Sequence, residues 1–555
     1  MRRLILLLIL LLLSIVQIKS QVETIPADHE VYPFLKEMFI KGSLADYDDE
    51  ILPLSKSQII AYLEEIKSHS YLLTEQEKEF LCKMEVKLGA VNETRVSYLE
   101  HFPAEFVRNF GKYNQKHLFF YNDSTASLNI DLLGDITYLY SNKYNDYSVL
   151  LNIGGQLYGS YSDWLGYLIE GSNGTQYKNR QVAELDPRVK TSFTFNNTAI
   201  NFFDYTQGYL RVQKDAVSLQ LGRERILWGN GYINKMILSD NPPLFDFLRF
   251  SIKYKSLRYD FLHAWLVQPF ETIYVDSLTG NIRQKGSKYL AISRLGFNPN
   301  QNLKLGITQM IIYANRPFEA AYLNPFLFWE SAQRTLGDLD NSFLSLDATY
   351  KVTNGIETSA SIIFDDILFS ALLKGEFDRV DNRSAWQAGI MVTNPIIPEN
   401  MTVKAEYLQI RPYTFSHPDI GESLTYTNNS YILGTNLQPN STALSAAISY
   451  LFPGNWKLGV TYSHILHGKN YYNSSGELIK NVGGNIFENL TLYDSRTAPL
   501  LDGRIEKADN ISVEIQNEII YGIYLQFIFN SSFTNSDAVN ESLYSLFSQL
   551  RLYFR

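Results

Sequence analysis

The sequence predicts an all-β transmembrane antiparallel β-barrel of about 18 strands, with a small N-terminal α-helical region. Three observations carry this prediction. The chain begins with an apolar run typical of an export signal, and no later apolar run is long enough for a spanning helix. Apolar and polar residues also alternate over most of the remaining length. This combination is typical of the bacterial outer membrane, where lipid-facing and lumen-facing residues of a strand alternate.

The first 20 residues have the pattern of a secretory signal peptide. Arg2 and Arg3 precede an apolar run over residues 4–16, and a more polar stretch follows. We expect cleavage after Ser20. The alternative, an uncleaved signal anchor, is disfavoured because the run is shorter than the roughly 20 apolar residues of a spanning helix. Since no Cys follows the run, a lipid-anchored form is not expected.

The composition narrows the class of protein further. The chain contains 38 Tyr and 33 Phe at a mean hydropathy of -0.15, and barrels use such aromatics in two interfacial girdles. The net charge of -9 argues against nucleic-acid binding, because no phosphate-facing surface is supplied. The single cysteine, Cys82, excludes an intramolecular disulfide framework, and we expect it to be a buried thiol in a helix.

Residues 21–104 predict a small helical region. Apolar residues recur at helical spacing over residues 29–41, and Gly42 ends the pattern. Residues 55–58 and 74–77 are capping boxes, and an amphipathic helix follows each of them. Because three short helices bury only a small core by themselves, we expect them to pack against something larger.

Residues 105–555 carry the period-two alternation of the barrel. Turn clusters such as 142–145 and 452–455 separate the alternating runs, and no helical segments are expected between them. An antiparallel meander follows from this spacing. At about 25 residues for each strand and its loop, this length accommodates about 18 strands, an even number within the bacterial range.

The last strand distinguishes a membrane barrel from a soluble β-protein. Leu546, Leu550 and Leu552 share one face, whereas Gln549 and Arg551 share the other. A last strand that pairs with the first leaves no free edge, which is the condition for a sheet to survive in lipid. This aromatic-rich alternating end resembles the outer-membrane insertion signal, which implies the barrel-assembly machinery and outer-membrane lipid as partners.

The densest motif spans residues 221–231 and is followed by residues 238–246. Unbroken alternation from Leu221 would place Arg223 and Arg225 toward lipid, at a cost of about 2–4 kcal/mol per cation at the bilayer midplane. Either the strand leaves the membrane at Gly222, or a bulge there turns both arginines inward. We expect the arginines to pair with nearby carboxylates. The candidates are Glu224, Asp240 and Asp246. We also expect the loop to narrow the lumen.

This block resembles the Wzi-like capsule-assembly family of outer-membrane proteins. The family pattern runs Gly-Arg, Trp-Gly-x-Gly and then Ser-Asp-Asn-x-Pro-Pro-Phe-Asp, and later blocks follow in the same order. Ser293 stands where the family commonly has His, and Gln309 lies near a usual acidic position. The matching segments here are residues 222–231, 239–246, 294–295, 303–306, 313–316, 322–325, 340–341, 365–366, 406–407, 412–417, 433–440 and 467–468.

The resemblance also covers residues 32–35 and 53–55, which look like the family's periplasmic helical region. That region packs at the inner mouth of the barrel, which implies that residues 21–104 form a plug. For function, it implies a non-enzymatic, lectin-like outer-membrane protein that assembles or attaches surface or capsular polysaccharide, without a cofactor or metal. The candidate ligand-binding residues are Arg223, Arg225, Trp228, Asp240, Asn241, Tyr158, Tyr161 and Trp164.

Several alternatives stay open. An interfacial girdle role is the default for Tyr158, Tyr161 and Trp164, and a structural role is at least as well supported for the arginine block. A porin or substrate channel with a constricted lumen would share every barrel feature. A hydrolase is disfavoured, because Ser463 and His464 are adjacent and neighbours on a strand point to opposite faces.

Overall fold

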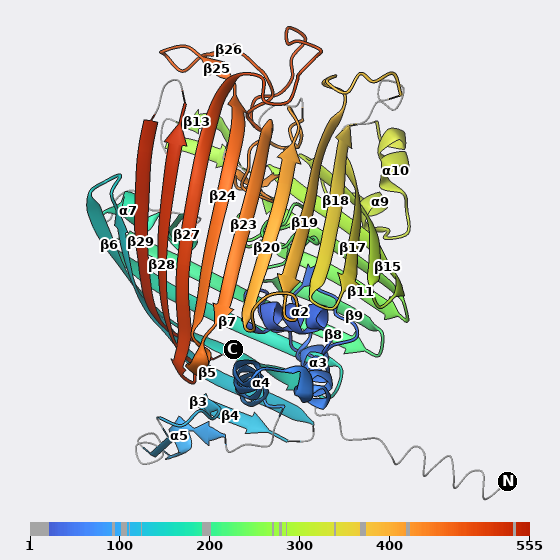
Figure 1. The fold of residues 1–555 in the computed structure, drawn as a ribbon. Helices are drawn as coiled ribbons and strands as arrows, with labels where there is room; N and C mark the ends of the chain where they lie inside the picture. Colours follow the sequence, from blue (N-terminus) through green and yellow to red (C-terminus); the bar gives the residue numbers. More distant parts are fainter. Residues whose placement is uncertain are drawn as a thin grey trace, which may run out of the picture.

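A computed structural model describes the protein over residues 21–90, 95–101, 108–109, 111–123, 125–190, 201–268, 271–276, 280–284, 286–337, 340–366, 373–417, 422–536 and 540–554. The predicted signal peptide, residues 1–20, lies outside the described residues. The chain forms a closed antiparallel barrel of 18 long strands, which confirms the predicted fold class (Figure 1).

The barrel strands follow one another around the wall in chain order. They are β5 (Ala126–Ser141), β6 (Asp146–Tyr161), β7 (Leu165–Lys178), β8 (Asn201–Lys214), β9 (Val217–Arg223), β11 (Asp246–Tyr254), β12 (Leu257–Val267), β15 (Ser287–Asn300), β16 (Leu303–Ala314), β17 (Asn341–Thr353), β18 (Ile356–Asp366), β19 (Arg383–Thr393), β20 (Met401–Ile410), β23 (Ser441–Leu451), β24 (Lys457–Lys469), β27 (Arg504–Ile520), β28 (Ile523–Asn535) and β29 (Asn540–Leu552).

The two mouths of the barrel differ. Short turns join the strands at the mouth that also holds the N-terminal helices and the C-terminus, and most connections at the opposite mouth are longer (Figure 1). Short turns mark the periplasmic side of an outer-membrane barrel and long loops the extracellular side. The helices therefore lie at the periplasmic mouth. Among the described residues, no helix is both long and apolar enough to cross a membrane.

The last strand closes the barrel as the sequence predicts. β29 pairs with β5 from Ser545 opposite Ser141 to Leu552 opposite Gly134. Below this seam a short strand, β4 (Phe119–Asn122), pairs with the start of β5 and continues its hydrogen-bonded edge. Leu546 and Leu550 are exposed on the outer wall, while Gln549 is buried in the lumen.

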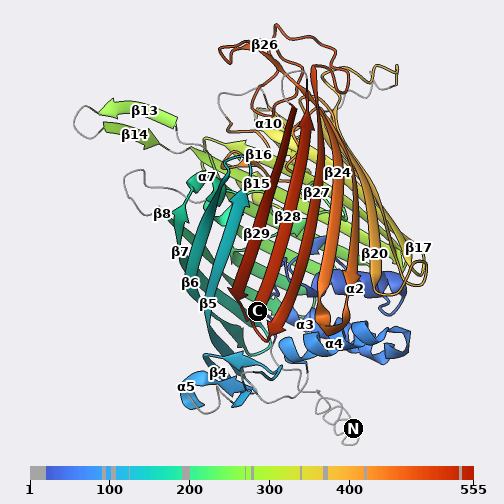
Figure 2. The same cartoon turned by 60° about the vertical axis from the view of Figure 1, so that its left-hand side comes forward.

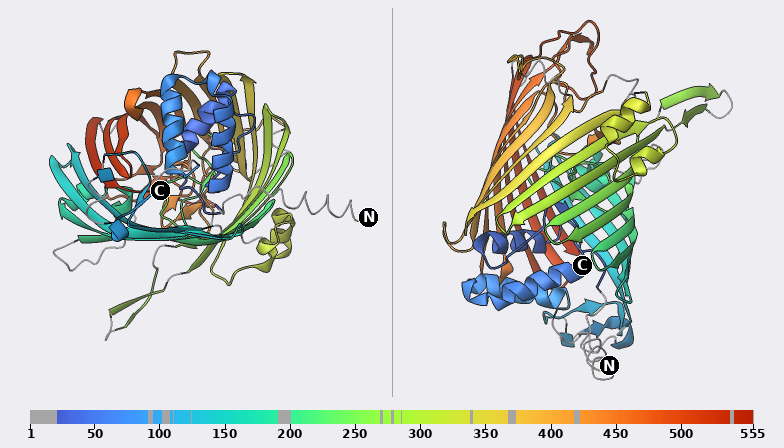
Figure 3. Two further views of the ribbon diagram at one scale, coloured as in Figure 1. Left: turned by 90° about the horizontal axis from the view of Figure 1, so that it is seen from below. Right: turned by 90° about the vertical axis from the view of Figure 1, so that its right-hand side faces the viewer.

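The three N-terminal helices are α2 (Val31–Lys41), α3 (Lys56–Ser68) and α4 (Glu75–Lys87). Both predicted capping boxes are present, at Ser55 with Gln58 and at Thr74 with Glu77. The helices share one apolar core, which extends to Met391 on β19. The expectation that they pack on something larger is thus confirmed, as the view from below shows (Figure 3).

Other short elements flank the barrel and the helical bundle. Near the bundle they are β1 (Ile51–Leu52), the 3-10 turn η1 (Ser70–Leu72), β2 (Val96–Ser97), α5 (Tyr98–His101) and β3 (Lys116–His117). Elsewhere they are β10 (Leu227–Trp228), β13 (Glu271–Asp276), β14 (Gly280–Gln284), β21 (Thr427–Asn428), β22 (Tyr431–Ile432), η2 (Pro453–Asn455), β25 (Tyr471–Tyr472) and β26 (Leu478–Lys480). The β13–β14 hairpin projects away from the extracellular side of the wall (Figure 2).

Two details of the sequence prediction are wrong. Cys82 is exposed rather than buried, although it does lie in a helix. Short helices also interrupt the meander, because the extracellular segments are long enough to fold back and bury apolar side chains of their own. They are α7 (Arg180–Ala183), α8 (Pro187–Lys190), α9 (Ala320–Leu323) and α10 (Trp329–Thr335).

Candidate functional site: a filled half and a polar half of the lumen

The segment that joins β9 to β11 lies inside the barrel. Its short strand β10 pairs with β1 of the N-terminal region, with Trp228 opposite Ile51. The Trp228 and Leu238 backbones hydrogen-bond to each other in both directions, at 2.9 and 3.1 Å. The indole of Trp228 is completely buried. This arrangement agrees with a loop that narrows the lumen.

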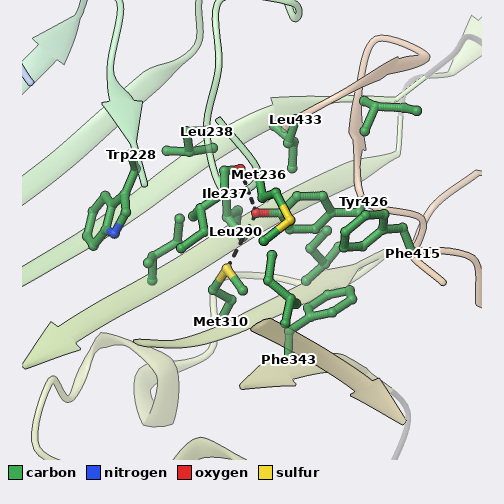
Figure 4. Packing of buried hydrophobic residues seen from close by; sticks show 14 of the residues in the cluster. Trp228, Met236, Ile237, Leu238, Leu290, Met310, Phe343, Phe415, Tyr426 and Leu433 are labelled. Carbon is green, nitrogen blue, oxygen red and sulfur yellow. Dashed lines mark hydrogen bonds between the residues drawn. The ribbon is translucent and has the colours of Figure 1, made fainter. Parts of the chain in front are cut away.

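A second segment, between β20 and β23, folds inward against the first. The Tyr426 hydroxyl donates to the Ile237 carbonyl at 2.8 Å, and its ring stacks on Phe415 with the centroids 5.2 Å apart (Figure 4). The Asn241 amide donates to the Ile432 carbonyl at 2.8 Å, so this candidate residue ties the two segments together. We call residues 224–245, 411–417 and 422–440 the lumen plug.

The lumen plug packs on apolar residues of the barrel wall. Strands β12 to β23 direct buried apolar side chains into the same cluster as Trp228 and Tyr426. The two inserted segments bury these apolar side chains as a protein core does. Charged residues on the same face pair with other buried groups: Asp260 pairs with Arg249, and Glu406 accepts from the Tyr232 backbone of the lumen plug. The wall residues are Leu262, Ala264, Leu266, Leu290, Ile292, Met310, Ile312, Phe343, Ile363, Ala385, Leu408, Ile410 and Ala443.

The two arginines of the dense motif point to opposite sides of the wall. β9 ends at Arg223, which stays in register opposite Asp246 with no bulge. The Arg223 guanidinium pairs with the Asp246 carboxylate at 2.8 Å, and both side chains are about half exposed. Arg225 lies beyond the strand end and pairs inward with Asp28 of the N-terminal segment at 3.6 Å. The strand therefore ends at the motif, and only Arg225 enters the lumen.

Arg225 belongs to a charged group inside the lumen. Burial would raise the pKa of Asp28, but the Arg225 and Arg551 guanidinium groups outweigh it and hold this pKa below its usual value. Burial would lower the pKa of Arg225, yet Asp28, Tyr205 and Asp240 raise it. The interaction with Asp240 shows that the fold brings these two candidate residues to the same part of the lumen.

The aromatic candidates lie at the periplasmic end. Tyr158 faces the lumen and packs with Leu168 and Tyr209 in a small buried cluster. Tyr161 is exposed at the end of β6, and its ring meets that of Trp164 edge-on in the turn that follows. This turn is one of the short periplasmic ones. The place of Tyr161 and Trp164 is that of an interfacial girdle, whereas Tyr158 packs on the lumen side of the wall.

Strands β24 and β27 line the other half of the lumen with polar side chains. Their outward positions carry exposed apolar or aromatic residues such as Tyr462, Ile511 and Ile515. Their inward positions are polar over most of the strand length, with Ile465 and Ala508 as the exceptions. We call the inward pairs the polar track: Gly459–Glu514, Thr461–Ser512, Ser463–Asn510, His467–Glu506 and Lys469–Arg504.

Cavities lie along the polar track from one mouth to the other. A periplasmic cavity of about 570 Å³ is lined by Gly459 and Glu514 together with His29 of the N-terminal segment. A cavity of about 470 Å³ follows beside Ser463 and Ser512. A side chamber of about 350 Å³ holds Arg225 and shares Asp28, Gln526 and Arg551 with the periplasmic cavity.

The extracellular end of the track is a cavity of about 480 Å³. His467, Lys469 and Arg504 line it from the strands, and Tyr472 and Asn485 line it from the loop above. The Asn485 amide donates to the Tyr472 hydroxyl at 3.3 Å, and His467 Nε2 lies 2.7 Å from the Gly484 carbonyl oxygen. An aromatic face beside amide, imidazole and cationic groups suits a polyhydroxylated ligand.

Sequence reasoning missed several residues of this half. Alternation puts Arg551 on the same face of the last strand as Gln549, and this pattern could have marked it as a lumen residue. Asp28 precedes the first periodic segment, so no pattern pointed to it. Tyr472 was also missed because it lies in an irregular loop, where no pattern pointed to it. In the described part of the chain, no group of three or more His, Cys, Asp or Glu side chains could hold a metal ion.

The closed barrel, its periplasmic helices and its partly filled lumen define an outer-membrane β-barrel protein. The family model described as capsule assembly protein Wzi matches residues 103–496, more than half of the chain. The chain therefore belongs to the Wzi capsule-assembly family, and it is an outer-membrane protein.

The chain is similar to several solved structures. One is the Escherichia coli outer-membrane protein Wzi, described as a carbohydrate-binding β-barrel involved in group 1 capsule assembly. It matches with a TM-score of 0.55 and 12% identity over 95% of this chain and 98% of that chain. Pseudomonas aeruginosa OpdK with vanillate matches with a TM-score of 0.44 and 10% identity over 77% of this chain and 98% of that chain. Comparison with curated proteins gives no match.

Proposed function

We propose that this protein binds surface or capsular polysaccharide during capsule assembly, as a lectin-like protein without enzymatic activity. The observation that carries the proposal is the polar track, which ends in the extracellular cavity beside Tyr472 and Asn485. Sugars bind through aromatic faces and directional hydrogen bonds, and this end offers both. Membership of a capsule-assembly family, and a solved relative described as carbohydrate-binding, support the same ligand class.

The candidate residues divide by place under this proposal. Arg225 and Asp240 line or face the charged part of the lumen, where they could contact a polymer that enters it. Trp228 and Asn241 hold the lumen plug in place. Arg223 joins two strand ends, and Tyr161 with Trp164 suits an interfacial girdle. Tyr158 packs inside the lumen wall.

The remaining partners follow from the barrel itself. Outer-membrane lipid surrounds the exposed apolar band of the wall. The barrel-assembly machinery acts on the last strand, whose outward Leu546 and Leu550 alternate with lumen-facing Gln549. No nucleic-acid partner is proposed, because the net charge is -9.

The test compares two neighbouring positions of one strand. Ser512→Trp would fill the polar track, whereas Val513→Trp changes the next residue, which faces outward. We expect Ser512→Trp to weaken the binding of purified capsular polysaccharide about tenfold or more, equivalent to about 1.4 kcal/mol. Val513→Trp is the control and should bind as the parent does. Equal binding by all three proteins would contradict a site in the track.

A constricted porin is the second candidate, and one observation favours it. The cavities follow one another along the same pair of strands through the lumen. Solute flux into liposomes that contain the full chain distinguishes the two functions. Flux of small sugars, together with retained surface polysaccharide in a deletion strain, would favour the channel. Loss of surface polysaccharide without flux would favour the lectin-like role.

A further inference from the structure

The extracellular segment between β16 and β17 folds back over the outside of the barrel. Helices α9 and α10 lie against the outer wall rather than over the mouth (Figures 1 and 3). Tyr322 of α9 and Trp329 of α10 are buried against outward residues of β12 and β16, among them Phe261 and Tyr313. These wall positions alternate with those that face the lumen plug.

The segment covers polar groups that would otherwise face lipid. The Gln309 amide donates to the Leu327 carbonyl at 2.9 Å, and Gln309 Oε1 accepts from the Trp329 backbone at 3.1 Å. The Tyr259 hydroxyl also donates to the Pro325 carbonyl. Because an unsatisfied polar group in hydrocarbon costs several kcal/mol, these contacts let Gln309 and Tyr259 stay in the membrane band. The segment takes the place of lipid on this part of the wall.

The outer surface of the same segment is itself aromatic. Phe318, Phe326 and Phe328 expose 59%, 85% and 56% of their surface. The ring of Phe326 also stacks on Tyr259, with the centroids 5.8 Å apart, so it continues the outer surface of β12. The neighbouring strands carry the exposed apolar band that faces lipid, and it includes Leu295, Phe297, Leu305, Ile307 and Leu346.

Three charged groups of the segment form ion pairs, while the Glu319 carboxylate accepts from the Ala321 backbone. Arg334 and Glu330 form an ion pair one helical turn apart at 2.8 Å, and Arg316 pairs with Asp340 at 2.5 Å. An amphipathic segment with phenylalanines on one side and paired charges on another is typical of a structure that lies in a membrane interface. The stack of Phe326 on Tyr259 joins the aromatic surface to the outer wall that carries the lipid-facing band, and this contact identifies lipid as the partner.

We infer that residues 315–337 form a membrane anchor, in which Phe318, Phe326 and Phe328 insert among the acyl chains of the outer leaflet. The anchor adds apolar area to one side of the barrel, above the strands that carry the filled half of the lumen. The aromatic surface of the anchor contacts lipid hydrocarbon rather than polysaccharide. The inference is independent of the proposed function, because it concerns only the outer wall.

Site-directed spin labelling of the full chain in phospholipid liposomes tests this. A Cys82→Ser background removes the only native thiol, and Phe326→Cys places a label at the most exposed of the three rings. Leu295→Cys, on a lipid-facing strand, is the control for hydrocarbon. Tyr493→Cys, fully exposed on an extracellular loop, is the control for water. Heat-modified gel mobility checks that each variant is folded.

Molecular oxygen concentrates in hydrocarbon, whereas a polar nickel chelate stays in water, and their relative collision rates report which medium surrounds a label. We expect the label at position 326 to collide more often with oxygen than with the chelate, as the label at 295 does. The label at 493 should show the reverse. If position 326 matches position 493, the aromatic surface faces water and the anchor is refuted.

Discussion

Two parts of the same barrel share the alternating strand pattern but differ in the side chains that face the lumen. From β12 to β23 an apolar cluster of inward residues, as at Leu262 and Leu408, is buried by the lumen plug, and charged residues such as Asp260 share that inward face. From β24 to β29 most inward residues are polar, as at Ser512 and Gln526, and cavities remain beside them. The outward alternation therefore specifies a membrane barrel, while the inward composition decides whether the lumen is filled.

The largest expected effect is on the filled half. Trp228→Ala removes a completely buried indole from the core of the lumen plug, which should cost about 3–5 kcal/mol of unfolding free energy. Denaturant unfolding in detergent, followed by circular dichroism, measures this. Trp164→Ala is the matched control, because Trp164 is 41% exposed. Asn510→Ala on the polar track should change stability by less than about 0.5 kcal/mol. Equal losses at all three positions would remove the distinction between the halves.

The helical bundle contacts the polar half as well as the filled half, where its apolar core extends to Met391 on β19. Glu518 of β27 is fully buried and accepts from Lys87 of α4 at 2.9 Å and from Lys83 at 3.2 Å. Glu518→Gln leaves the buried Lys87 ammonium without its carboxylate partner, while Lys83 keeps Glu30 at 2.8 Å. This should cost about 3 kcal/mol of unfolding free energy. Limited proteolysis should cleave the bundle faster in this variant. Glu506→Gln, in a more exposed pair on the same strand, should leave the cleavage rate unchanged; a matching increase there would contradict the assignment.

The sequence determines the wall better than it determines the lumen. Alternation at residues such as Leu546 and Gln549 follows directly from a lipid face and a lumen face, and the capping boxes at Ser55 and Thr74 are local. These features were predictable and are confirmed. The predicted meander without helices was wrong, because whether a loop such as α9–α10 folds back depends on what it can cover.

The candidate site shows the same limit. The dense motif correctly marked a segment that enters the lumen, since two arginines cannot both continue a lipid face. It could not separate Arg223 from Arg225, because the choice depends on where β9 ends and on Asp28, which is far away in sequence. The extracellular cavity was missed because Tyr472 and Asn485 come together only through the fold.

A smaller effect concerns pH at the periplasmic end of the polar half. Burial, with repulsion from Lys87, lowers the pKa of His29 from 6.5 to about 3. The unfolded chain therefore takes up a proton below pH 6.5 that the folded protein does not accept until about pH 3. The contribution of neutral His29 to the unfolding free energy is therefore fully present above pH 6.5. It declines as the pH falls, by about 2 kcal/mol between pH 6.5 and 5.

His29→Asn tests this, because the amide oxygen can still accept from the Val31 backbone as the imidazole Nδ1 does at 3.1 Å. We expect the stability of this variant, measured by denaturant unfolding at pH 7 and pH 5, to change less with pH than that of the parent. The carboxylates next to His29, Asp28 and Glu30, have lowered pKa values and stay ionised in this range. If the stability of the variant changes with pH as much as that of the parent, groups other than His29 cause the pH dependence.

The smallest effect on stability separates the two arginines of the dense motif. Arg223→Ala removes an ion pair that is about half exposed on the outer wall, which should cost about 0.2–1 kcal/mol. It should leave single-channel conductance unchanged. Arg225→Ala removes a cation that lines the side chamber of about 350 Å³. Single-channel conductance should therefore change, and ion selectivity should shift toward cations. Planar-bilayer recordings of the two variants measure both quantities. If Arg223→Ala alters conductance as much as Arg225→Ala does, the boundary between wall and lumen does not pass between these two residues.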